Sequence, residues 1–187
     1  METQQFIIGD AALNQVVPLF RAIWEHTHSP LLVAFKDDWE YTGKRILEMF
    51  KRVGLIPFHK ELHGISCEEL GDAIREVDEH TKEEVLIIAI GNDVLADEVK
   101  ITCGKLKLPF MIVATTPSSS AYASAFSFWE GKIEESCAPY AVIADTTILG
   151  KASKETMQKG CIEILSRLTS GADWLYASAL LGKPCLQ

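Results

Sequence analysis

An unbroken apolar run that ends in one glycine and a helical pattern constrains this chain more than any other feature. Residues 85–90 read VLIIAI, with no polar residue alternating among the apolar ones. A strand of this composition has both faces buried, as in a parallel sheet that is covered by helices on both sides. Similar apolar runs recur at residues 31–35, 110–113 and 141–144.

Amphipathic helical patterns separate these predicted strands. Residues 12–26 and 41–53 each place their apolar side chains on one face. The sequence SCEE at residues 66–69 has the form of a capping box that opens a helix, and residues 94–106 predict another helix. The alternation of strands and helices predicts an α/β fold with a Rossmann-like, doubly wound parallel sheet.

The pattern changes near Gly150. The 187 residues, 48% of them hydrophobic, suffice for a sizeable core, and residues 1–150 predict a nucleotide-binding domain of the Rossmann type. Residues 151–187 predict a short helical C-terminal extension, with an apolar stripe and a break near residues 170–171.

Charge and cysteine content exclude several classes of protein. The formal net charge of −8 argues against nucleic-acid binding, which needs a basic face. The first eight residues lack the basic and apolar regions of a signal peptide, and no apolar run is long enough to span a membrane. The five cysteines are scattered and form no CxxC pair, so we expect a reduced, cytoplasmic protein without structural zinc.

The turn after residues 85–90 is where nucleotide-binding α/β proteins hold a phosphate. Glycines there let backbone N–H groups approach a pyrophosphate at a helix N-terminus. Here Gly91 is followed by Asn92 and Asp93. A carboxylate about 4 Å from a phosphate costs about 1 kcal/mol in water and about 4 kcal/mol at an effective dielectric of 20. The alternative is that Asn92 or Asp93 simply caps the following helix.

Two other loops follow predicted strands. Residues 115–120 read TTPSSS after the strand at 110–113, at the sheet edge where open α/β proteins bind ligands. The alternative there is a solvated turn. Asp37 and Asp38 follow the strand at 31–35, where a carboxylate can bind an adenosine ribose, or else they cap the helix at residues 39–53.

Together these segments resemble the metal-dependent, iron-containing alcohol dehydrogenases, nearest the glycerol-1-phosphate and glycerol dehydrogenase branch. Residues 91–100 (GNDVLADEVK) stand where the family has GGG(S/T)xxDxAK, and residues 109–124 are similar to its PFISVPTAPSTDGIAS segment. Residues 141–146 match an AVIAD-T strand, residues 159–163 (KGCIE) an AGxGD helix, and residues 173–174 a later DW pair.

The resemblance implies hydride transfer between NAD or NADP and an alcohol carbon, with a divalent metal that polarises the alcohol oxygen. It places Thr115, Thr116 and Ser118 against the cofactor, and Ser120 at the position of an Asp that contacts the substrate. It also implies that the metal is held by an Asp on the GxGD helix and by two His of a C-terminal helical domain.

The chain departs from this pattern at the phosphate loop and at the metal site. Val94 replaces the loop hydroxyl, and Glu163 replaces the metal-ligating Asp. All five histidines lie at or before His80, so the two C-terminal histidines have no counterpart. The histidine pair at 59 and 63 falls in a predicted strand and loop, which lacks the helical geometry of a zinc motif. We therefore expect weak NAD(P) binding, no bound metal and no catalytic residues.

These departures favour a degenerate nucleotide-binding or interaction module that is not catalytic alone. Its ligand would be a weakly bound dinucleotide or another small ligand without a phosphate. The alternative is a fragment or subunit of an NAD(P)-dependent polyol dehydrogenase that another chain completes. Apolar residues of the tail, such as Trp174 and Leu180, lack the helical domain that would cover them. We therefore expect a symmetric homodimer.

Overall fold

Six parallel strands form the central sheet of this computed structural model, which describes residues 3–64, 66–81 and 83–182. Their order across the sheet is β1-β8-β5-β4-β2-β3, and every neighbouring pair is parallel. The strands are β1 (Gln5–Gly9), β2 (His28–Phe35), β3 (Phe58–Leu62), β4 (Glu84–Gly91), β5 (Phe110–Ala114) and β8 (Ala141–Asp145). A separate antiparallel hairpin consists of β6 (Phe126–Trp129) and β7 (Lys132–Glu135). The predicted α/β fold is confirmed.

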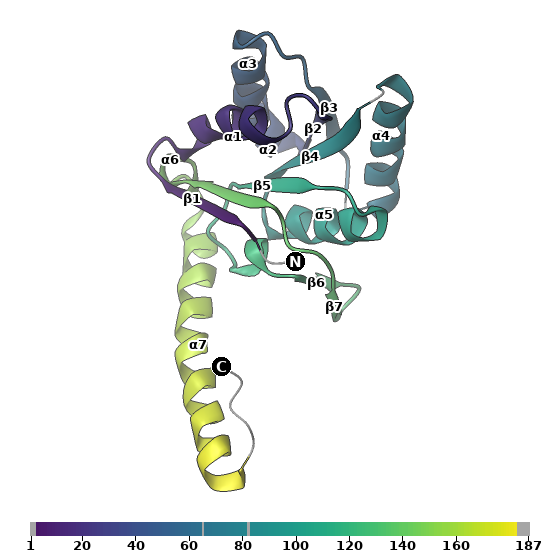
Figure 1. Ribbon diagram of the computed structural model, residues 1–187. Coiled ribbons are helices and arrows are strands. Elements are labelled where there is room, and N and C mark those ends of the chain that lie inside the picture. Colours follow the sequence, from purple (N-terminus) through teal and green to yellow (C-terminus); the bar gives the residue numbers. More distant parts are fainter. Residues whose placement is uncertain (1–2, 65, 82, 183–187) are drawn as a thin grey trace.

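Helices cover both faces of the sheet (Figure 1). Along β4, Leu86 and Ile88 pack toward α1 (Val16–Ile23) and α3 (Lys44–Arg52), whereas Ile87 and Ala89 pack toward α4 (Cys67–His80) and α5 (Asp93–Leu106). This explains why β4 carries no polar alternation. The helical elements are η1 (Ala12–Gln15), α1 (Val16–Ile23), α2 (Lys36–Asp38), η2 (Trp39–Gly43), α3 (Lys44–Arg52), α4 (Cys67–His80), α5 (Asp93–Leu106), η3 (Ala121–Ala123), α6 (Thr146–Leu149) and α7 (Lys154–Leu181).

Helix α5 is buried on all sides over residues 95–103. The sheet and α4 cover part of its surface, and the hairpin β6–β7 covers another part. Three charged residues, Asp97, Glu98 and Lys100, are consequently buried within this helix. Their burial was not predicted from the sequence, and their contacts organise the site described below.

Helix α7 runs without interruption from Lys154 to Leu181 and extends away from the sheet (Figure 1). The predicted break near residues 170–171 was wrong. A single glycine in a helix interior costs only about 1 kcal/mol relative to alanine, so Gly171 alone does not end a helix. Most apolar side chains of α7 are exposed, including Leu168, Trp174 and Leu180. None of the described helices has the length and apolar character needed to cross a membrane.

Candidate functional site

The loop between β4 and α5 lies at the carboxyl edge of the sheet. Asn92 caps α5, because its Oδ1 accepts a hydrogen bond from the Leu95 backbone N–H at 3.2 Å. The capping alternative is thus confirmed for Asn92, and Asp93 becomes the first residue of the helix. Gly91 allows a close approach: a Cβ on it would lie 2.8 Å from Leu95 Cδ2 and 3.4 Å from Asp38 Oδ2.

Asp38, rather than Asp37, turns toward this loop. Asp37 is exposed at the start of α2, and neither aspartate makes a capping hydrogen bond to the helix backbone, so the capping alternative for Asp37 and Asp38 was wrong. Burial raises the pKa of Asp38, which the Thr115 hydroxyl opposes and the charge of Asp37 reinforces. The Thr115 hydroxyl is itself buried and has no partner with regular hydrogen-bond geometry among the described residues. Ribose binding by Asp37 stays a prediction.

The hydroxyl-rich loop after β5 is held in its conformation largely by hydrogen bonds among its own residues. Thr116 Oγ1 lies 3.0 Å from Ser118 Oγ and 2.9 Å from Tyr122 Oη, and Tyr122 Oη also donates to the Thr116 carbonyl at 2.9 Å. Burial raises the pKa of Tyr122 to about 12, with smaller contributions from the charges of Asp93 and Asp38. The structure therefore gathers Asp38, Asp93, Thr116, Ser118 and Tyr122 at one edge of the sheet. Sequence reasoning missed Tyr122, whose one signal was an aromatic residue within a run of small ones.

The end of the same loop meets α7. Both carboxylate oxygens of Glu163 accept the Ser120 backbone N–H at 3.1 Å, and Oε1 also accepts the Ser120 hydroxyl. Arg167 donates through Nη2 to Ser120 Oγ at 2.7 Å and to Glu163 Oε1 at 3.2 Å. Partial burial by itself raises the pKa of Glu163, but the contacts with Ser120 and Arg167 outweigh it and lower that pKa.

A groove of about 750 Å³ lies beside this contact. Its walls come from the loop after β5, from α6 and from the first turns of α7. Apolar atoms make up most of the surface, and the polar groups are the hydroxyls of the loop together with Glu163 and Arg167. The residues that shape it include Pro117, Ser119, Leu149, Met157, Cys161 and Ile164.

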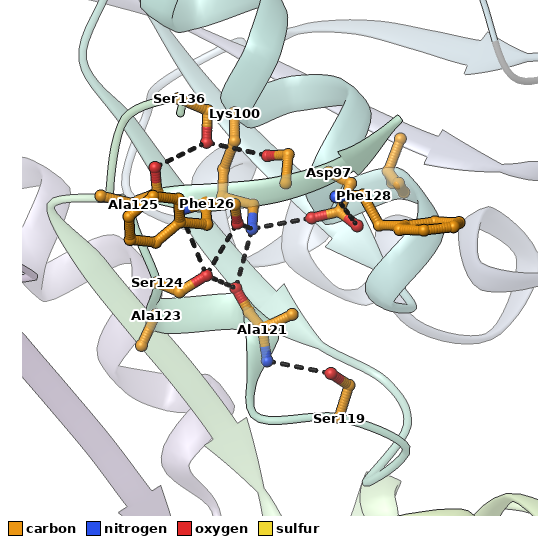
Figure 2. A network of polar contacts seen from close by, with 12 residues as sticks. Asp97, Lys100, Ser119, Ala121, Ala123, Ser124, Ala125, Phe126, Phe128 and Ser136 are labelled. Carbon is orange, nitrogen blue, oxygen red and sulfur yellow. Dashed lines mark hydrogen bonds and ion pairs between the residues drawn. The ribbon is translucent and has the colours of Figure 1, made fainter. Parts of the chain in front are cut away.

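A buried lysine supports the loop from behind (Figure 2). Lys100 Nζ lies 2.7 Å from Asp97 Oδ1 and donates to the carbonyls of Ala121 at 2.9 Å and Phe126 at 2.6 Å. Asp97 Oδ2 accepts the Phe128 backbone N–H at 3.1 Å. The sequence signal for this pair was the match of Asp97 and Lys100 to the Asp and Lys of the D-x-A-K part of the family pattern.

The histidine pair of the sequence does not form a helical metal motif. His59 lies in β3, as predicted, and its ring stacks on Trp39 with centroids 4.9 Å apart. His63 contacts Glu69 through Nδ1 at 2.9 Å. The Glu69 carboxylate also accepts the His63 backbone N–H at 3.2 Å, and the Ser66 half of the predicted capping box forms, with Ser66 Oγ accepting the Glu69 N–H at 3.2 Å. Within the described ranges, no three His, Cys, Asp or Glu side chains are grouped to hold a metal ion.

Comparisons with known proteins match this architecture. The family model described as iron-containing alcohol dehydrogenase matches residues 7–153. Glycerol-1-phosphate dehydrogenase [NAD(P)+] of Methanosphaerula palustris is 30% identical over 185 residues, and that of Methanoregula boonei is 27% identical over 182 residues. Each alignment covers 95% of this chain and 49% of the relative. The crystal structure of glycerol dehydrogenase from Schizosaccharomyces pombe superimposes with a TM-score of 0.82 at 20% identity, covering 95% of this chain and 46% of that one.

Proposed function

Because this chain belongs to the iron-containing alcohol dehydrogenase family, we propose that it is a binding or interaction module that does not oxidise alcohols by itself. The resemblance to this family is confirmed. The chain spans about half the length of the curated relatives that it matches. The dehydrogenase activity in the names of those relatives is therefore a hypothesis for this chain. The residues of the site described above decide whether this chain can bind the cofactor and whether it can catalyse the reaction.

The observation that carries the proposal is the chemistry of the loop after β4. Gly91 and the N-terminus of α5 offer the close approach and the positive dipole end that a pyrophosphate needs. The carboxylate of Asp93 stands in the first turn of that helix, and the carboxylate of Asp38 lies behind Gly91. Each opposes a phosphate by about 1–4 kcal/mol at about 4 Å, so the loop suits NAD or NADP only in part. The loop therefore suits either a dinucleotide that binds weakly or a small ligand without a phosphate.

A second candidate is a dehydrogenase subunit that another polypeptide completes. The coverage of about half of each named glycerol-1-phosphate dehydrogenase favours it, as does the groove between the loop after β5 and α7. In that case glycerol or glycerol 1-phosphate would be the substrate, and Ser120 would line its site. The cysteines described as free, at positions 67, 103, 137 and 161, suit a reducing, cytoplasmic setting for either candidate.

The test of the proposal is a titration of the full chain with NADH and NADPH, together with an assay on glycerol and glycerol 1-phosphate. We expect no turnover and a Kd near or above millimolar, which corresponds to about −4 kcal/mol. Asp93→Asn should tighten binding at least tenfold, because it removes the charge and keeps the side-chain shape. Asp173→Asn, an exposed change on α7, is the matched control and should have no effect. Micromolar binding by the unchanged chain, or turnover with added zinc or iron that Glu163→Ala abolishes, would refute the proposal.

We also propose that the chain forms a symmetric homodimer. The apolar side chains of α7 are exposed over most of its length, and the edge strand β1 exposes Phe6 and Ile8 on one side. Soluble monomers rarely expose large apolar patches, and a twofold dimer is the commonest closed assembly that would cover one. Light scattering at micromolar concentration should give the dimer mass, and deletion of residues 173–187 should give the monomer. A monomeric native chain, or a dimer that survives the deletion, contradicts this proposal.

A further inference from the structure

The start of α7 is fixed to the loop after β5 by two contacts of different kinds. One is a close backbone approach: a Cβ on Gly160 would lie 2.0 Å from the Pro117 carbonyl oxygen, so only glycine fits there. The other is polar and joins Glu163 to both the N–H and the hydroxyl of Ser120. These two residues of α7 lie three positions apart, so they are on one face of the helix, toward the loop.

Glu163 stands at the position where the resemblance places a metal-ligating Asp, which makes the fit to a metal testable. Its carboxylate already accepts two kinds of donor from Ser120, and the guanidinium of Arg167 lies 3.2 Å from Oε1. A divalent cation bound to Oε1 would be repelled by this guanidinium at short range. The Arg167 side chain also donates to Ser120 Oγ, so that hydroxyl is engaged as well. The residues at this position do not fit a metal ion.

We propose that Arg167 takes the place of a divalent cation beside Glu163, and that Glu163, Ser120 and Arg167 form a metal-independent clasp between α7 and the loop after β5. Glutamate and arginine four residues apart on a helix face one another, and this order of the charges is the favourable one. Hydrogen bonds between ionised groups are stronger than neutral ones. The clasp therefore supplies from within the chain the positive charge that a metal would supply from outside.

The clasp has a structural role that does not depend on whether a dinucleotide binds. Its three residues, Ser120, Glu163 and Arg167, all line the groove of about 750 Å³. Together with the contact of Gly160 on Pro117, it sets the direction in which α7 leaves the domain. The contact between α7 and the loop after β5 should consequently form equally well with added metal and with chelators.

The experiment compares the native chain with Glu163→Ala, Glu163→Gln and Arg167→Met by hydrogen exchange and by Zn²⁺ titration. Glu155→Gln is the matched control, because Glu155 pairs with Lys159 on the same helix and both side chains are largely exposed. We expect the Ser120 amide to exchange at least tenfold faster in Glu163→Ala and faster in Arg167→Met than in the native chain. Glu163→Gln, which keeps an acceptor oxygen, should lie between, and the control should match the native chain.

Zn²⁺ and EDTA should leave the melting temperature of the native chain unchanged. Stoichiometric Zn²⁺ binding in the micromolar range that disappears in Glu163→Gln would overturn the proposal, and so would unchanged exchange at Ser120 in Glu163→Ala. Zn²⁺ binding that persists in Glu163→Gln lies at another site, and exchange at Ser120 then decides. None of these readouts uses NAD(H) or turnover, so failure of the clasp is distinguishable from failure of the proposed function.

Discussion

Replacing Lys100 with methionine is expected to reduce the free energy of unfolding by about 3–5 kcal/mol, the cost of breaking a buried ion pair by removing one partner. The side chain of Lys100 is fully buried and pairs with Asp97, so the change leaves the largely buried Asp97 carboxylate without its cation. It also removes the amine that donates to the carbonyls of Ala121 and Phe126, which then keep, within the described part of the chain, only their hydrogen bonds from Ser124. A typical domain is stable by only about 5–15 kcal/mol, so much of the stability of this one would be lost.

Urea denaturation followed by circular dichroism measures this effect. Lys105→Met is the control, because Lys105 lies on the same helix and is exposed. Changes at such a surface position stay within about 0.5 kcal/mol. The double variant Lys100→Met with Asp97→Asn should recover part of the loss, since it no longer buries an unpaired charge. Equal stability of the Lys100 and Lys105 variants would show that the buried amine does not hold the loop.

The second large effect is a pH dependence of stability that originates at Glu98. This side chain is fully buried on α5, and neither of its carboxylate oxygens has a partner with regular hydrogen-bond geometry among the described residues. Burial raises the pKa of Glu98 from 4.5 to about 7, opposed by the Ser66 backbone and reinforced by the charge of Glu69. The folded chain therefore holds a proton on Glu98 over a pH range in which the unfolded chain has released it.

Because the folded-state pKa is the higher one, the stability contributed by Glu98 is complete below about pH 4.5 and is lost as the pH rises to about 7. A shift of this size corresponds to about 3 kcal/mol. We expect the free energy of unfolding of Glu98→Gln, relative to the native chain, to rise by about that amount between about pH 4.5 and pH 8. Denaturant titrations across that range measure the difference, with the exposed Glu68→Gln as control. Parallel pH profiles for Glu98→Gln and the native chain would contradict this assignment.

The fold class was predictable because the central strands of the sheet and most of the helices carry local signals, whereas β1 and the hairpin β6–β7 were not predicted. The apolar run of β4 and the glycine that follows it indicate a buried parallel strand before a helix. Asn92 is a frequent capping residue, and it caps α5. The uninterrupted path of α7 through Gly171 was not predictable in this way, because a glycine weakens a helix without deciding whether it ends.

The site was less predictable because its decisive contacts join residues far apart in the sequence. Ser120 and Arg167 are separated by 47 positions, and no local pattern indicates that they meet. The choice between Asp37 and Asp38 depended on the turn into α2, which exposes the first and half-buries the second. Glu98 could not be predicted to be buried, because a glutamate in a helix is ordinarily on its solvent-facing side.

Because α7 is long, the direction of its anchored N-terminal part determines where its C-terminal end lies. The contacts that anchor α7 end at Arg167, so the 14 residues beyond it extend for about 21 Å at about 1.5 Å per residue. A rotation of about 10° at that anchor therefore displaces the far end by about 4 Å, more than one hydrogen-bond length. A small change in the tilt of α7 at the groove therefore gives a larger displacement at its apolar C-terminal end. A partner bound at that end would be displaced relative to the sheet.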